Sequence, residues 1–203
     1  MITLYHAPQS RSSRIIWLLE ELGAPYRIEQ VSIFRPMTGT GAPDPSNPHP
    51  DKQVPAIVRG DDLVAESVAI ILYLIDAFPE AGLGPVVGAP GRGEYLTWVA
   101  WYAAGMEPAM FAAMGDELTA SPLKQRSYDA MVRRLEGALA RGPYMMGETF
   151  SAVDLLVASA INFARRVFPQ SATLDAYVAR CTARPAAVRA AALDDATGLQ
   201  RAA

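Results

Sequence analysis

Three serines gather where the first predicted helix begins. Ser10, Ser12 and Ser13 follow a proline-containing turn, and Arg11 and Arg14 lie among them. A helix cap alone would use one of these serines. A hydroxyl or amide donor at this point would also stabilise an anion such as a thiolate, helped by the helix dipole. The cluster therefore has two readings, a cap and a site that holds a thiolate.

A proline begins an apolar segment further along the chain. Pro55 is the second residue of the apolar segment 54–58, although proline cannot donate a hydrogen bond to a sheet. One interpretation is the start of an edge strand. The other is a cis proline that turns the main chain of Val54 outward, where its N–H and C=O pair with an extended peptide.

The dipeptide Glu66-Ser67 opens the second predicted helix. Ser67 is an ordinary candidate for an N-cap. The free N–H groups and the dipole of a helix start also bind a carboxylate. Glu66 beside it could pair with an ammonium group. Because a free amino-acid head carries both charges, this pair of residues suits the α-amino acid end of a ligand.

The composition excludes several classes of protein. A balance of 18 Lys and Arg against 21 Asp and Glu, net charge −3, lacks the basic surface of a nucleic-acid binder. The longest apolar run, residues 68–75, is far shorter than the roughly 20 residues of a membrane span. One Cys (Cys181) and two His (His6 and His49) argue against a disulfide framework and a zinc site. The first residues lack a basic leader, so we expect a cytoplasmic protein.

The first eighty residues alternate between strand and helix patterns. The expected strands cover residues 2–6, 26–31, 54–58 and 63–65, and the expected helices cover residues 15–22 and 67–75. Gly23 stands where a left-handed helix end favours glycine. Because the chain begins strand–helix–strand, the first two strands should pair in parallel. The last two strands should form a hairpin.

Prolines and glycines interrupt this order at two places. Residues 34–50 contain too many of them for a regular helix, which predicts a long loop. Residues 82–91 have the composition of a linker. Beyond it strands disappear, and helices are expected over residues 94–114, 122–140, 152–166, 174–183 and from 186 onward. The chain is therefore predicted to hold an α/β domain over 1–81 and an all-helical domain over 92–203.

Five segments in this order resemble the glutathione S-transferase superfamily, in a bacterial form with a serine-type, theta-like active-site turn. They are LYHAPQSRSSR at 4–14, NP at 47–48 with KQVPAI at 52–57, ESVAI at 66–70, FSAVD at 150–154 and RPA at 184–186. The resemblance implies an α/β thioredoxin-like N-terminal domain, of element order βαβ-α-ββα, that binds glutathione. It also implies an all-α C-terminal domain that shapes the pocket for an electrophile.

The resemblance assigns six residues to glutathione binding, and these are Lys52, Gln53, Val54, Pro55, Glu66 and Ser67. The backbone of Val54 would pair with the cysteinyl unit, across a cis Pro55. Glu66 and Ser67 would hold the γ-glutamyl head. The two residues before Val54 would reach the side of the glycyl carboxylate.

The resemblance leaves the thiol-activating residue open between three hydroxyls. Alignment with serine-type classes places Ser10 at the glutathione sulfur, and we prefer it two to one over Tyr5, the position of the tyrosine-type classes. Ser12 is a third candidate. The segment 35–50 departs from the short helix that the family has before Val-Pro. In the helical half, Ser151 to Asp154 matches a capping box, which gives Asp154 a structural role.

These features predict a homodimeric glutathione transferase that needs no metal or cofactor and uses glutathione as co-substrate. The enzyme would lower the pKa of the bound thiol and present the thiolate to an apolar electrophile. Two alternatives stay open at this point, a glutathione-dependent isomerase or dehalogenase, and a non-catalytic glutathione-binding module. The wall of the electrophile pocket could draw on Met and aromatic residues of the helical half, although such residues are twice as common in a helix core. These residues are Tyr102, Met106, Phe111 and Met114.

Overall fold

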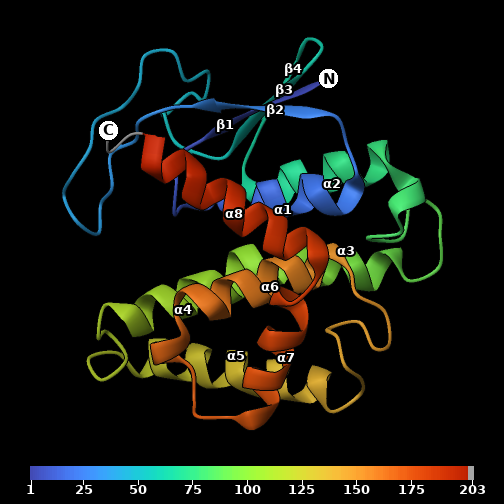
Figure 1. The fold of residues 1–203 in the computed structure, drawn as a ribbon. Coiled ribbons are helices and arrows are strands. Elements are labelled where there is room, and N and C mark those ends of the chain that lie inside the picture. The colour runs from blue at the N-terminus through green and yellow to red at the C-terminus, as the bar shows by residue number, and fades with distance from the viewer. Residues whose placement is uncertain (201–203) are drawn as a thin grey trace. The chain divides into compact units, whose positions relative to one another are not determined.

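The computed structural model describes residues 1–200, with side chains described up to residue 196 (Figure 1). Internal contacts divide the chain into two compact units. One consists of Met1–Ala81 together with the C-terminal helix α8 (Pro185–Gln200), and the other of Gly82–Arg184. Residues 201–203, the end of the predicted helical domain, lie outside the described residues.

The first unit is built on a mixed four-stranded sheet of order β2-β1-β3-β4. Its strands are β1 (Ile2–His6), β2 (Tyr26–Gln30), β3 (Ala56–Arg59) and β4 (Asp62–Ala65). β1 and β2 pair in parallel, as the strand–helix–strand order predicts, whereas β3 is antiparallel to both of its neighbours. The predicted hairpin of β3 and β4 is confirmed.

Helices α1 (Ser13–Leu22) and α2 (Ser67–Ala77), with the short 3-10 helix η1 (Pro79–Ala81), complete the N-terminal segment. α1 buries its apolar residues and ends at Gly23, whose φ of 60° is the left-handed value that a glycine adopts without strain. The helix that the resemblance implies between β2 and β3 is absent. Residues 31–55 form a loop with one isolated bridge from Arg35 to Thr40, because prolines interrupt any helical hydrogen-bond ladder there.

The last helix packs on the first unit. α8 runs beside α1 (red and blue in Figure 1), and Arg189 donates to Glu20 of α1 over 2.6 Å. The sequence predicts one helical domain over residues 92–203, whereas these contacts group α8 with the sheet. Periodicity shows that a segment is helical but not which partner covers its apolar face, so sequence reasoning missed this grouping.

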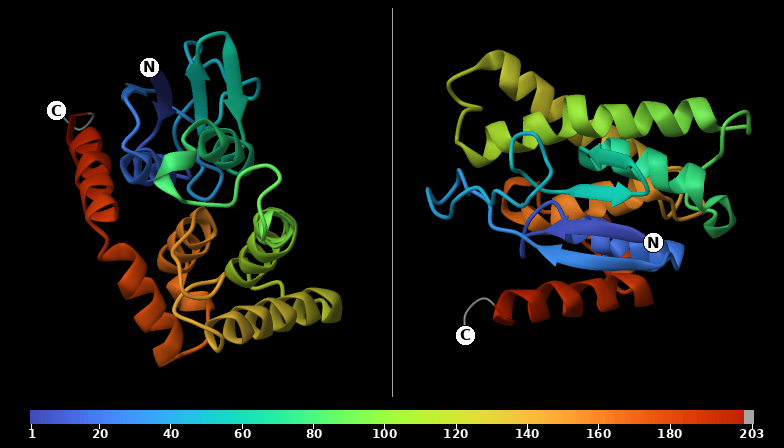
Figure 2. Two further views of the ribbon diagram at one scale, coloured as in Figure 1. Left: turned by 90° about the vertical axis from the view of Figure 1, so that its right-hand side faces the viewer. Right: turned by 90° about the horizontal axis from the view of Figure 1, so that it is seen from above.

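The second unit is all helical, as predicted (Figure 2). Its elements are α3 (Arg92–Trp101), η2 (Tyr102–Met106), α4 (Glu107–Met114), α5 (Pro122–Leu139), α6 (Ala152–Phe163), η3 (Arg165–Val167) and α7 (Ala172–Thr182). The predicted helix over 94–114 is one helical run that a π-helical turn, η2, interrupts. η3 is a 3-10 turn, and α6 is buried along most of its length.

A buried carboxylate organises the start of α6. Asp154 is 0% exposed, and its two oxygens accept from the N–H groups of Met145 (2.8 Å) and Ser151 (2.9 Å) and from the Tyr177 hydroxyl (3.1 Å). Burial raises the pKa of Asp154 against the opposing effect of these hydrogen bonds. The predicted capping box is therefore present, and the carboxylate also joins a preceding turn to α7.

We expect Asp154→Ala to lower the free energy of unfolding by about 2–4 kcal/mol, because it leaves several buried donors without an acceptor. Urea denaturation of the full chain measures this. Asp175→Ala is the matched control, since Asp175 is 56% exposed and forms a surface ion pair with Arg165. Equal stability of the two variants would contradict a structural role for Asp154.

Candidate functional site

The register of the sheet brings three predicted segments to one edge. Tyr5 near the end of β1 pairs with Ala56 at the start of β3, and Ala56 pairs with Ala65 at the end of β4. The turn after β1, the segment before β3 and the segment after β4 consequently leave the sheet at the same edge. The serine cluster, Val54-Pro55 and Glu66-Ser67 belong to these three segments.

Backbone strain is concentrated in the same segments. Four described non-glycine residues have a positive φ, and three of them are Gln9 (53°), Lys52 (54°) and Glu66 (68°). Each left-handed non-glycine residue costs on the order of 1–3 kcal/mol, and such residues cluster at ligand sites. The strain makes this edge of the sheet a candidate functional region, independently of the sequence motifs.

The Val54–Pro55 peptide bond is cis, as the sequence suggested. Pro55 is buried and Val54 half-buried, and the main-chain N–H and C=O of Val54 make no hydrogen bond within the described part of the chain. Both groups are therefore available to an extended ligand. The side chain of Gln53 is exposed, and the ammonium group of Lys52 donates to the main-chain oxygen of Asn47 over 2.7 Å.

Ser67 is the first residue of α2 and not its N-cap, which is Glu66. The Ser67 side chain is buried, with the residue 8% exposed, and its Oγ has no hydrogen-bond partner within the described structure. Glu66 is exposed beside it. A buried hydroxyl without a partner costs on the order of 1–3 kcal/mol, so a polar ligand group at this helix start would recover that cost.

The serine turn holds a compact network. Ser12 occupies the N-cap position of α1, but its side chain makes no capping bond. Its Oγ lies 2.8 Å from Nδ1 of His6 and 2.7 Å from Oγ of Ser10. Ser10 in turn donates to the carbonyl oxygen of Ala7 over 2.7 Å. Ser12 and His6 are fully buried, whereas Ser10 and Tyr5 are half-buried, so the latter two hydroxyls are the reachable ones.

A carboxylate from α8 anchors this turn. Asp194 lies 3.1 Å from Nε2 of His6, accepts from Oγ of Ser13 over 2.8 Å and accepts from the N–H of Gln9 over 3.2 Å. Partial burial opposes the charge, but the bonds from His6, Ser13 and Gln9 outweigh it and lower the pKa of Asp194. The carboxylate is thus the form that holds the turn. No local pattern marked His6 or Asp194 as part of the site. Asp194 lies 181 positions after Ser13, so only the folded chain brings it to this turn.

The loop between β2 and β3 supports the site from the other side. Arg35 donates to the carbonyl oxygens of Pro8 (2.6 Å) and Gln9 (3.3 Å) and so holds the serine turn. The amide of Asn47, fully buried, donates to the carbonyl oxygen of Gln53. The Pro- and Gly-rich segment therefore fixes both the turn and the residues before Pro55. Sequence reasoning predicted a loop there but missed the role of Arg35.

Other chemistry is not supported by the described residues. Burial raises the pKa of the Cys181 thiol to about 12, so it is not a nucleophile. Within residues 1–196, no group of three or more His, Cys, Asp or Glu side chains is placed to hold a metal ion. Among the described helices, none combines the length and apolar character that crossing a membrane requires.

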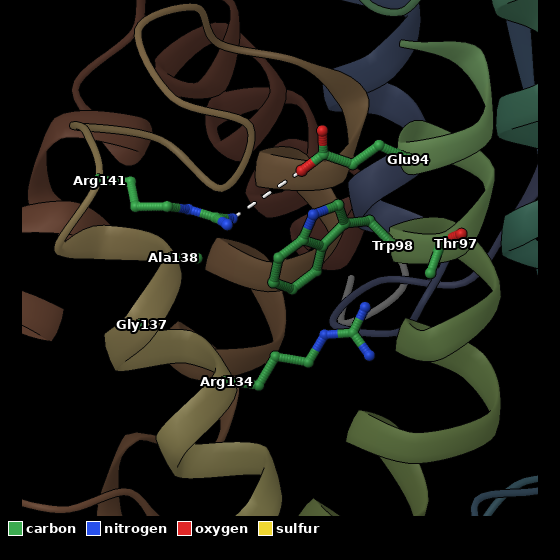
Figure 3. Close-up of a pocket in the computed structure, with 7 residues that line it drawn as sticks. All are labelled: Glu94, Thr97, Trp98, Arg134, Gly137, Ala138 and Arg141. Atoms are coloured by element: carbon green, nitrogen blue, oxygen red, sulfur yellow. Dashed lines mark ion pairs between the residues drawn. The ribbon is translucent and has the colours of Figure 1, made fainter.

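The helical unit has a cavity of about 460 Å³ between α3 and α5 (Figure 3). It is lined by Glu94, Thr97, Trp98, Arg134, Gly137, Ala138 and Arg141. The Arg134 guanidinium lies 4.5 Å from the ring centres of both Trp98 and Trp101. Tyr102 and Met106, two of the candidate pocket residues, are buried in this unit.

Two family models cover most of the chain. The N-terminal domain model of glutathione S-transferases matches residues 4–82, and the C-terminal domain model matches residues 100–190. A thioredoxin-like sheet unit followed by a helical unit defines the fold class of these enzymes. The chain belongs to the glutathione S-transferase superfamily.

Individual relatives agree with this assignment. The chain is 26% identical over 156 residues to glutathione S-transferase 3 of Schizosaccharomyces pombe, covering 77% of this chain and 62% of the relative. A Dictyostelium discoideum protein with a glutathione S-transferase domain is 30% identical over 53% of this chain and 45% of its own length. The chain thus spans at most about three fifths of these curated relatives.

Solved structures share the fold over nearly the whole chain. A glutathione transferase from Methylococcus capsulatus is 27% identical, with a TM-score of 0.77 and coverage of 96% of this chain and 99% of its own. A sphingomonad glutathione S-transferase complexed with glutathione is 22% identical, with a TM-score of 0.78 and coverage of 95% and 98%.

Proposed function

We propose that this protein is a glutathione transferase that binds glutathione at the sheet edge and activates its thiol. The observation that carries the proposal is the buried, unpartnered hydroxyl of Ser67 at the start of α2. Family membership, the free main chain of Val54 and the complex of the sphingomonad relative with glutathione support it.

The γ-glutamyl head of glutathione fits this helix start. Its α-carboxylate accepts from the Ser67 hydroxyl and from the N–H groups at the start of α2, where the helix dipole favours an anion. Its ammonium group pairs with the exposed carboxylate of Glu66. The cysteinyl unit pairs with the main chain of Val54, and Gln53 and Lys52 lie toward the glycyl carboxylate. This arrangement places the thiol toward the serine turn.

We assign thiol activation to Ser10. Ser12 is fully buried and cannot touch the ligand. Ser10 donates to the neutral carbonyl of Ala7 in the free protein. A bond to a charged acceptor contributes about 1.5–3 kcal/mol, against about 0.5–1.5 kcal/mol for a neutral one. The Ser10 hydrogen therefore transfers its bond from Ala7 to a bound thiolate, which lowers the pKa of the thiol.

Ser67→Ala should weaken glutathione binding by about 1–3 kcal/mol, because the ligand carboxylate loses a hydrogen-bond donor. Titration calorimetry measures the change. Ser127→Ala is the control, since Ser127 is an exposed serine that bonds within α5. Unchanged affinity in a Glu66→Ala/Ser67→Ala double variant would overturn the proposed site.

Ser10→Ala should raise the pKa of bound glutathione by about one unit or more and slow conjugation while leaving affinity nearly intact, since about 1.4 kcal/mol of thiolate stabilisation corresponds to one unit. The ultraviolet absorbance of the thiolate against pH reports this. Tyr5→Phe is the internal control. If Tyr5→Phe alone raises the pKa, the protein uses the tyrosine-type hydroxyl. Wild-type protein that binds glutathione without forming thiolate would be a binding module.

We further propose that two copies associate, each placing the sheet unit of one chain against the helical unit of the other. Support comes from family membership and from exposed apolar residues on both units, Leu63 of β4 and Leu96 of α3. Sedimentation at micromolar concentration should give twice the chain mass, and a 21.8 kDa particle would reject the proposal.

A further inference from the structure

A continuous hydrogen-bonded chain runs from the serine turn to the last helix. Oγ of Ser10 lies 2.7 Å from Oγ of Ser12, which lies 2.8 Å from Nδ1 of His6, and Nε2 of His6 lies 3.1 Å from the Asp194 carboxylate. Its two middle members are 0% exposed, whereas Ser10 is half-buried at the site. The chain therefore links a reachable hydroxyl to a buried imidazole and carboxylate.

Hydrogen positions along this chain follow from its charged end. The ionised Asp194 accepts a hydrogen bond, so the ring nitrogen that faces it, Nε2 of His6, carries the hydrogen. Nδ1 of His6 is then the acceptor, and Ser12 donates to it. The connectivity resembles a hydrolase triad, but a substrate carbonyl cannot reach a fully buried Ser12. What can travel along this chain is a proton.

We propose that the His6–Asp194 pair takes up the proton of the glutathione thiol, relayed by the hydroxyls of Ser10 and Ser12. The inference rests on the proposed function, with Ser10 at the sulfur. Ligand binding first turns the Ser10 hydroxyl from the Ala7 carbonyl toward Oγ of Ser12. The thiol S–H bond then breaks and its proton passes to Ser10, Ser10 gives its own proton to Ser12, and Ser12 gives its own to Nδ1 of His6. The products are a thiolate and an imidazolium paired with Asp194.

After proton transfer, the hydrogen bonds of this network run in the opposite direction and stabilise the thiolate and the imidazolium. After transfer, Ser10 donates toward the sulfur, Ser12 donates to Ser10, and the imidazolium donates to Ser12 and to Asp194. A free imidazole holds a proton about a hundredfold less tightly than a free thiolate does. In this product the imidazolium forms an ion pair with Asp194, and Ser10 donates to the sulfur. Asp194 is accordingly a positioning residue that acts through His6 and does not touch the ligand.

Nitrogen NMR of ¹⁵N-histidine-labelled protein tests the relay directly, because the chain has two histidines. We expect glutathione to convert His6 from the neutral ring to the imidazolium, whereas S-methylglutathione, which carries no thiol proton, leaves it neutral. His49, whose Nδ1 accepts from the N–H of Asp51, is the internal control. A neutral His6 in a complex whose ultraviolet absorbance shows thiolate would overturn the relay. A complex without thiolate would instead overturn the proposed function.

Asp194→Asn provides a second test, since asparagine keeps the size of the side chain and one acceptor oxygen. We expect the ratio of thiolate to thiol in the complex at neutral pH to fall about tenfold, about one pKa unit, with glutathione affinity changed by less than that factor. Asp195→Asn removes the same charge from an exposed neighbour and should change neither. Ser12→Ala should match Asp194→Asn, and combining the two should add no further loss. Weaker binding with an unchanged thiolate fraction in Asp194→Asn would show a structural clamp and overturn the relay.

Discussion

The pairing of β3 with both β1 and β4 is the constraint on which the proposed site depends. Ala56 is opposite Tyr5 on one side and Ala65 on the other. This register makes three segments far apart in the sequence leave the sheet at one edge. Side chains alternate between the two faces of a strand. A slip of one residue in β3 would therefore turn every side chain of β3 to the opposite face of the sheet. The proposed glutathione site therefore depends on the backbone ladder before it depends on any single side chain.

The same edge contains features that destabilise the protein without a ligand. Gln9, Lys52 and Glu66 adopt left-handed backbone conformations, and Ser67 buries a hydroxyl without a partner. Each of these features costs free energy in the folded state. Their concentration in the segments that the family motif assigns to glutathione supports a ligand that compensates for them.

The two ends of the chain meet at the serine turn. α8 packs on α1 and contributes Asp194, while the loop between β2 and β3 contributes Arg35. The N-terminal segment alone thus lacks the groups that hold its turn. α8 belongs to the α/β unit, although it follows the helical unit in the sequence. The geometry of the serine turn therefore depends on the N-terminal segment, the loop between β2 and β3, and α8 together.

The amino-acid sequence alone predicts the strands, most helices and the three segments proposed to bind glutathione, because these predictions depend on local periodicity, on turn residues and on short family motifs. The Gly23 helix end was also a local property, whereas the local sequence left Pro55 open between the start of an edge strand and a cis bond. Only the tertiary structure decided that Ser12 bonds to His6 and not to its helix, and that Asp194 completes the turn. The contact between Ser13 and Asp194, 181 positions apart, depends on how α8 packs on α1, and hydrophobic periodicity identifies an apolar face without identifying what covers it.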